Sequence, residues 1–237
     1  MGKLELSIIV PAFKEEHRIP KFLKSLIDFT TSRLQNYEVL IINDGSPDST
    51  KKVVLDHIKD RKEYKLLSYE TNKGKGHAVL MGVLKAKGDF ILFIDADGSI
   101  KPPEILRMYS ILQKHKYEIV IGSRVSSSSN ITEPQPLRRR LLSKFFNIYS
   151  NILFRININD LLCGFKGFDR KAAIQIFKNL KAFRWEFDVE ILYRARKNKL
   201  KVYQMPIEWK HEEGSKIKIL DPVFILLNLI VLRLRYL

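Results

Sequence analysis

Short apolar segments alternate with longer mixed segments along the first half of the chain. The segments with strand-like patterns are residues 6–10, 37–42, 66–69, 90–94 and 118–122. Phe90–Ile94 is apolar throughout, which favours a strand buried on both faces of a parallel sheet. The helix-like segments between them are 18–32, 49–59, 76–87 and 103–114, and Pro102 and Pro103 suit the start of the last one. This alternation predicts an α/β sandwich with right-handed crossovers.

The second half of the chain has a different pattern. Leu137–Phe154 shows helical spacing, and its first turns carry Arg138, Arg139, Arg140 and Lys144. Strands are predicted at 161–168 and 200–205, and helices near 170–177 and 185–198. Residues 126–130, followed by Pro134 and Pro136, are typical of a flexible loop.

The end of the chain is an apolar run. Residues 223–232 are apolar except for Asn228, and Arg233 and Arg235 follow them. A membrane-spanning helix needs about 20 apolar residues, so this run is too short to cross a bilayer alone. We expect it to lie in a membrane interface or to pack on the protein.

Composition limits the class of protein. The chain has 237 residues, 45% of them hydrophobic, which suits one large domain or one domain with a small appendage. The lone Cys163 excludes an internal disulfide and a multi-cysteine zinc site, and we expect it to be a packed residue rather than a nucleophile. Residues 1–12 lack the pattern of a secretory signal. The net charge of +16 predicts an anionic partner: nucleic acid, an anionic membrane surface or a phosphorylated substrate.

Chemistry-bearing residues gather after the predicted strands. Each of the loops 11–16, 43–48, 72–76 and 95–98 adds a carboxylate, a glycine or a lysine. Ligands of α/β proteins bind beyond the carboxyl ends of the strands, which is where these loops should lie. The segment Asn72-Lys73-Gly74-Lys75-Gly76 fits neither the P-loop nor the dinucleotide fingerprint, although its backbone could approach phosphates.

Asp95 and Asp97 are the strongest candidates for a metal-binding site. Two carboxylates one residue apart at a strand end can share a hard divalent cation, which would bridge a diphosphate. The alternative is a turn with two solvated aspartates. Asp44 could accept hydrogen bonds from a base or ribose, or cap its own turn with Gly45 and Ser46. Glu15 could also accept hydrogen bonds from a base or ribose, or it could start a helix.

Four strings in this half resemble the family 2 glycosyltransferases. They are Val10-Pro11-Ala12-Phe13-Lys14-Glu15-Glu16, Asn43-Asp44-Gly45-Ser46-Pro47-Asp48-Ser49-Thr50, Asn72-Lys73-Gly74-Lys75-Gly76 and Asp95-Ala96-Asp97-Gly98. The second half is similar to the polyprenyl-phosphate sugar transferases, and closest to their dolichyl-phosphate glucosyl branch. Its matching strings are Gly122-Ser123-Arg124, residues 136–144, residues 160–168, residues 184–190 and Pro206-Ile207-Glu208-Trp209 with Gly214-Ser215-Lys216. The resemblance covers nearly the whole chain.

The resemblance implies a fold and a set of sites. The fold would be the α/β GT-A (Rossmann-like) fold, with a mainly parallel central sheet and C-terminal amphipathic helices. A catalytic domain would span 1–216, with a donor half at about 1–123 and an acceptor half at about 124–216, and 217–237 would be a membrane-interface tail. The nucleotide-sugar pocket would comprise Pro11, Ala12, Phe13, Glu15, Asp44, Lys73, Gly74, Asp95, Ala96 and Asp97. Asp95 and Asp97 would hold Mg²⁺ or Mn²⁺, and Arg124, Arg139 and Ser143 would bind the acceptor phosphate.

The implied reaction is an inverting transfer of glucose from UDP-glucose to dolichyl phosphate, for protein glycosylation at the cytoplasmic face of a membrane. Such an enzyme would be peripheral or monotopic, and Asp95, Asp97, Arg124, Arg139 and Asp188 would be its catalytic residues. Asp188 could orient a sugar hydroxyl or assist proton transfer, or instead pair with Arg184 on its helix. The alternatives are a mannosyltransferase using GDP-mannose, a soluble glycosyltransferase that extends a glycan, and a basic nucleic-acid-binding protein. We expect no nucleic-acid partner, because no such motif stands out.

Overall fold

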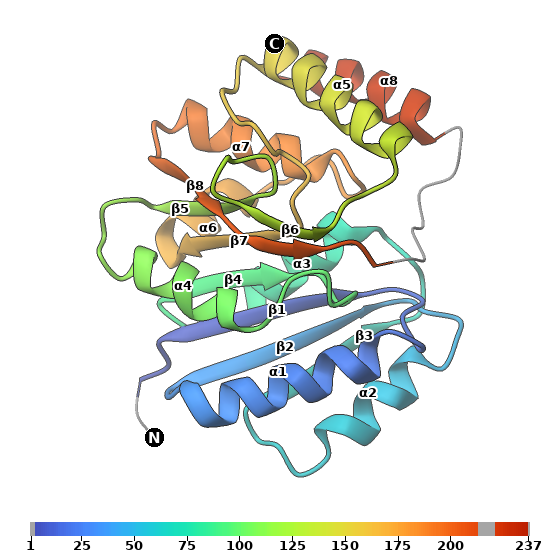
Figure 1. Ribbon diagram of the computed structural model, residues 1–237, viewed down its shortest axis with the longest axis vertical. Coiled ribbons are helices and arrows are strands. Elements are labelled where there is room, and N and C mark those ends of the chain that lie inside the picture. The colour runs from blue at the N-terminus through green and yellow to red at the C-terminus, as the bar shows by residue number, and fades with distance from the viewer. Residues whose placement is uncertain (1–2, 213–220, 237) are drawn as a thin grey trace.

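A seven-stranded sheet forms the centre of the computed structural model, which describes residues 3–212 and 221–236 (Figure 1). Its strand order is β3-β2-β1-β4-β7-β5-β8. The strands are β1 (Leu6–Ala12), β2 (Tyr37–Asp44), β3 (Tyr64–Tyr69), β4 (Phe90–Ile94), β5 (Ile119–Ser123), β7 (Phe165–Asp169) and β8 (Val202–Pro206). Only β7 runs antiparallel to its neighbours, so the sheet is mainly parallel, as expected.

Helices cover both faces of the sheet, because its central strands are apolar on both sides. β1 shows this clearly, since Ile8 and Val10 belong to one core and Ile9 belongs to the other. The first core is covered by α1 (Ile19–Arg33), α2 (Thr50–Ile58) and α4 (Pro103–Leu112). The second is covered by α3 (Lys75–Lys85), α6 (Arg170–Phe177) and α7 (Phe187–Lys197). These layers confirm the expected α/β architecture.

A second, two-stranded sheet corrects one prediction. β6 (Asn130–Glu133) pairs in parallel with β9 (Glu208–Lys210), where a flexible loop was expected. Ile131 lies opposite Trp209 in this pairing. The local sequence is polar and bounded by prolines, so the strand depends on a partner far along the chain rather than on its own pattern.

Two helices form the layer farthest from α1 and α2. α5 (Leu137–Phe154) and α8 (Asp221–Leu234) lie side by side, and α5 has the bounds that its spacing predicted (Figure 1). Leu229 and Leu232 of α8 are buried in the second core. The Asn228 amide donates a hydrogen bond to Glu186 at 2.6 Å, and Arg233 donates one to the carbonyl oxygen of Leu153 at 3.1 Å. One face of α8 is therefore part of the packed protein.

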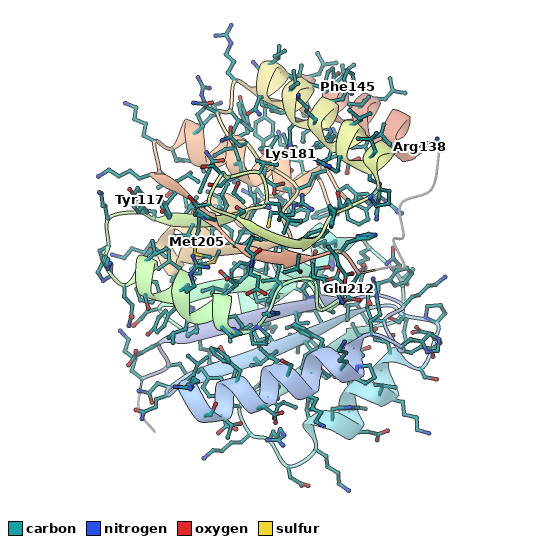
Figure 2. All side chains as sticks on the ribbon, in the orientation of Figure 1. Tyr117, Arg138, Phe145, Lys181, Met205 and Glu212 are labelled. Carbon is teal, nitrogen blue, oxygen red and sulfur yellow. The ribbon has the colours of Figure 1, made fainter. Side chains whose placement is uncertain are left out.

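The opposite faces of these two helices are apolar and exposed. The exposed apolar face consists of Leu137, Leu141, Leu142, Phe145, Ile148 and Ile152 of α5, with Leu227, Ile230, Val231 and Leu234 of α8. Figure 2 shows Phe145 and Arg138 on α5 at this end of the molecule. No helix within residues 3–212 and 221–236 is long and apolar enough to cross a membrane. The boundary expected at residue 216, and with it residues 217–220, lies outside the described residues.

Candidate active site

Three parallel strands end at the same edge of the sheet. β1 leads into Phe13 and Glu15, β2 ends at Asp44, and β4 leads directly into Asp95. The register pairs Ala12 with Asn43 across β1 and β2, so the ends of these strands are level. The predicted nucleotide-sugar residues of these three strands therefore share one rim of the sheet.

Asp44 organises this rim by holding a loop from elsewhere in the chain. Its carboxylate accepts hydrogen bonds from the backbone N–H groups of Lys73 at 2.8 Å and Gly74 at 2.9 Å. The amide of Asn72 donates a third, at 2.7 Å. Gly74 has φ +100°, and a Cβ there would lie 2.4 Å from the carbonyl oxygen of Phe183. Asp44 thus fixes Lys73 and Gly74 of the predicted pocket in place.

Asp95 and Asp97 meet two cations at the end of β4. The ammonium of Lys75 lies 2.6 Å from Oδ1 of Asp95. Burial and the neighbouring charge of Asp95 raise the pKa of the Asp97 carboxyl, although the N–H of Ser99 donates to it at 2.9 Å. The Arg18 guanidinium also interacts with both aspartates through its charge.

The carboxylate pair suits a hard divalent cation. A bound cation would relieve the repulsion that raises the pKa of Asp97, and carboxylate oxygens are the ligands that Mg²⁺ and Mn²⁺ prefer. Among the described residues, no cluster of three or more His, Cys, Asp or Glu side chains could hold a metal ion. The other ligands would therefore be donor phosphates and water, which is how Mg²⁺ is commonly bound beside substrate phosphates.

Sequence reasoning missed the cations of this rim. Arg18 is held by a two-pronged pair with Glu15, whose Oε2 and Oε1 lie 2.8 and 2.7 Å from its nitrogens. Glu15 was expected to line the pocket or to start a helix, and its spacing of three residues from Arg18 was the available signal. Lys75 was recognised only as part of a glycine-lysine loop. Burial acts to lower the pKa of Lys75, but the charges of Asp95, Asp188 and Asp97 together raise it.

Arg124 follows β5, and one edge of its guanidinium group is paired with Asp160. The guanidinium donates to Asp160 at 2.8 and 2.7 Å, and the backbone N–H of Arg124 donates to the same carboxylate at 2.9 Å. Burial acts to lower the pKa of Arg124, but the charge of Asp160 raises it. The pair uses Nε and Nη2 of the guanidinium. Asp160 was not among the predicted site residues.

Arg139 and Ser143 lie one turn apart on α5 and are both half-buried. Burial and the positive charge of Arg124 lower the pKa of Arg139. The two guanidinium groups are therefore close enough to repel each other. An anion between them would relieve this repulsion, and a phosphate is the anion that arginine forks bind best.

Asp188 pairs with a different residue from the one that helical spacing suggested. It is buried on α7, and its Oδ1 accepts a hydrogen bond from the ammonium of Lys166 at 2.6 Å. Its ion pair is thus with Lys166 of β7 and not with Arg184. Burial raises the pKa of the Asp188 carboxyl, against the opposing charges of Lys166 and Lys75. Cys163 is also buried, which raises the pKa of its thiol to about 12 and confirms it as a packed residue.

Gly164 joins the loop after α5 to the end of β4. Its carbonyl oxygen accepts a hydrogen bond from the backbone N–H of Asp95 at 3.0 Å. A Cβ at this position would lie 1.8 Å from Oδ2 of Asp95. The Asp95 carboxylate therefore occupies space that only a glycine leaves open.

Comparison with known proteins agrees with this architecture. Residues 7–177 match the model of glycosyl transferase family 2. The chain belongs to that family. A dolichyl-phosphate beta-glucosyltransferase of Dictyostelium discoideum is 36% identical over 100% of this chain and 76% of its own length. That of Homo sapiens is 32% identical, over 98% of this chain and 76% of its own length. Family 2 enzymes transfer sugars, and this chain is a glycosyltransferase.

Solved structures show the same fold. Glucosyl-3-phosphoglycerate synthase from Mycobacterium tuberculosis with UDP has a TM-score of 0.73 at 15% identity, over 98% of this chain and 79% of that one. The same enzyme with Mn²⁺, UDP-glucose and phosphoglyceric acid also has a TM-score of 0.73, at 16% identity, with the same coverage. The fold of the chain is the GT-A glycosyltransferase fold.

Proposed function

We propose that this glycosyltransferase moves glucose from UDP-glucose to dolichyl (polyprenyl) phosphate, with inversion at the anomeric carbon, to give a lipid-linked sugar for protein glycosylation. The observation that carries the proposal is the arrangement of opposite charges around one loop. Asp95, two residues before Asp97, contacts Gly164 at one end of residues 160–164. Arg124, whose charge interacts with that of Arg139, contacts Asp160 at the other end. The names of the relatives support the choice of glucose and dolichyl phosphate.

The donor would occupy the rim of the sheet. Pro11, Ala12 and Phe13 at the end of β1 and the Asp44-anchored Lys73–Gly74 segment would line its nucleotide pocket, with Glu15 and Ala96 beside them. Asp95 and Asp97 would hold Mg²⁺ or Mn²⁺, which supplies positive charge to the departing diphosphate. Mn²⁺ in the synthase structure supports a divalent ion in this fold.

The acceptor phosphate would lie between the arginines. A phosphate monoester has a second pKa near 6, so at neutral pH it is largely ionised and needs little help from a general base. The harder task is to bring two anions together, which Arg124, Arg139 and the hydroxyl of Ser143 would do by binding the phosphate. Asp160 holds Arg124 by Nε and Nη2, so that Nη1 lies outside this pair and can meet a phosphate. The phosphate oxygen would then attack the anomeric carbon opposite the leaving diphosphate.

A lipid acceptor would also explain the exposed apolar face. Arg139 and Ser143 lie on α5, the same helix that contributes much of this face. Arg138, Arg140 and Lys144 are exposed on that helix and could contact anionic headgroups, each adding about 1 kcal/mol. We therefore propose a peripheral enzyme on the cytoplasmic face of a membrane, with the face of α5 and α8 in the interface.

Replacing Leu141 and Phe145 together by glutamine should weaken sedimentation with anionic liposomes about tenfold or more, because each buried apolar side chain contributes about 1.5–3 kcal/mol. High salt should weaken sedimentation of the wild-type protein too. The matched control is Leu55→Gln/Leu84→Gln, which changes two exposed leucines on α2 and α3. Equal sedimentation of both double variants would contradict the proposed membrane face.

A donor panel tests the reaction itself. UDP-glucose, UDP-N-acetylglucosamine and GDP-mannose are each offered with dolichyl phosphate, with and without EDTA, and glycolipid is measured by radiolabel transfer. We expect product from UDP-glucose, and its loss with EDTA, since the aspartate pair needs a cation to neutralise the diphosphate. Product from GDP-mannose alone would assign the chain to the mannosyl branch. No lipid product from any donor would reject the proposal.

A further inference from the structure

Lys166 is a buried charge that the proposed chemistry does not use. It lies on β7 with none of its surface exposed, and its ammonium donates to three oxygens. These are Oδ1 of Asp188 at 2.6 Å, the carbonyl of Cys163 at 2.7 Å and the carbonyl of Leu161 at 3.0 Å. All three donors of the ammonium are thereby used. Because apolar side chains of similar volume often stabilise a core as well or better, stability alone does not account for this pair.

We infer that Lys166 and Asp188 are positioning residues that hold residues 160–164 as a common wall between the donor and acceptor sites. The inference rests on the proposed function and deepens it. Neither residue needs to touch a substrate in this role. Two of the three bonds of Lys166 are to the backbone of this loop, and the third anchors it to α7 through Asp188.

Each end of the loop contacts a different site. At its first residue, Asp160 binds both the backbone and the guanidinium of Arg124, on the acceptor side. At its last residue, Gly164 accepts the N–H of Asp95 and packs against its carboxylate, on the donor side. The carbonyls that Lys166 binds lie between these two ends. A shift of the loop would therefore move Arg124 and Asp95 together.

Asp188 adds a second connection to the donor side. Its charge attracts Lys75, whose ammonium lies 2.6 Å from Asp95. Lys166, Asp188, Lys75 and Asp95 thus form a row of alternating charges from β7 to the end of β4. Removing Lys166 alone would leave Asp188 with less compensation in a buried position, which strongly destabilises a fold. The informative variants remove both charges at once.

The test compares two affinities in the full chain. Lys166→Met/Asp188→Leu is assayed for Mn²⁺ affinity in the presence of UDP by electron paramagnetic resonance, and for binding of a short-chain polyprenyl phosphate by calorimetry. Both affinities should fall about tenfold or more, the usual effect of losing the groups behind a metal ligand. Lys166→Met/Asp188→Asn removes the same charges with less change of shape, and it replaces the first variant if that one does not fold.

Three reference variants show whether the loss of both affinities, for Mn²⁺ and for the polyprenyl phosphate, is specific to the Lys166–Asp188 pair. Asp97→Asn should weaken Mn²⁺ alone, and Arg139→Ala should weaken the acceptor alone. Glu190→Gln changes another buried carboxylate of α7, which binds the N–H groups of Lys181 and Ala182, and should lower only the melting temperature. A folded double variant with wild-type values for both affinities would overturn the inference. So would a loss of kcat with both affinities intact, which would make Asp188 a catalytic residue. If the wild-type protein binds both ligands but forms no glycolipid, the proposed function fails instead.

Discussion

Replacing Asp95 and Asp97 together by asparagine should reduce kcat/KM for glycolipid formation by about 10³-fold or more, because a bound cation stabilises the departing diphosphate by several kcal/mol. Asparagine keeps the shape of each side chain but removes the charges that would bind the cation. Mn²⁺ affinity, measured with UDP present, should fall with the activity. The melting temperature is recorded beside the activity, because the variant also removes the carboxylate that lies 2.6 Å from the Lys75 ammonium.

Asp89→Asn is the matched control for this pair. Asp89 precedes β4 at the opposite end of the strand and pairs with Lys3 at the surface. Its replacement should leave kcat/KM near the wild-type value. Undiminished turnover by a folded Asp95→Asn/Asp97→Asn enzyme would show that catalysis does not depend on a cation held by these two carboxylates.

Gly164→Ala should reduce kcat/KM by about 10²-fold through one added methyl group. The new Cβ would lie 1.8 Å from Oδ2 of Asp95, so the carboxylate or the loop must move. Displacement of a catalytic group by about 1 Å can cost this much in rate. The measurement is kcat/KM as a function of Mn²⁺ concentration, with the melting temperature recorded beside it.

Gly82→Ala separates this effect from general overpacking. A Cβ at Gly82 would lie 2.5 Å from Cγ2 of Ile9, in the core between α3 and β1. Overpacking of this kind costs about 1–3 kcal/mol of stability. The Gly82 variant should therefore melt at a lower temperature but keep its turnover. If both variants lose activity equally, the space beside Asp95 has no special role.

The rim of the sheet was predictable because its signals are local. Asp95 directly follows an apolar strand, and Asp44 follows another, so each was visible from its own segment. The two aspartates and the loops around them were therefore placed correctly relative to the strands. What those carboxylates bind within the protein was not predictable. Lys75 and Arg18 are near them only because parallel strands bring separate loops to one edge.

Long-range partners explain the other omissions. Asp160 is 36 residues from Arg124, and Asp188 is 22 residues from Lys166, so no periodicity connects them. The pairing of Asp188 with Arg184 was one of two alternatives, and it came from helical spacing, which relates only residues close together in the sequence. The place of β7 in the sheet, between β4 and β5, was not predictable for the same reason. A short buried strand has the same sequence pattern whatever its direction or its neighbouring strands.

The place of β7 in the sheet has a consequence for making hybrid enzymes. β5 pairs only with β7 and β8 among the described strands, and both come from later in the chain. A donor half cut at residue 123 would therefore contain β5 without any strand beside it, and β4 with one open edge. A hybrid that takes its nucleotide specificity from a relative would therefore need β7 as well as the first half from that relative. The alternative is to graft single loops onto an intact sheet. Modular recombination at the midpoint of the gene would instead separate strands that fold only together.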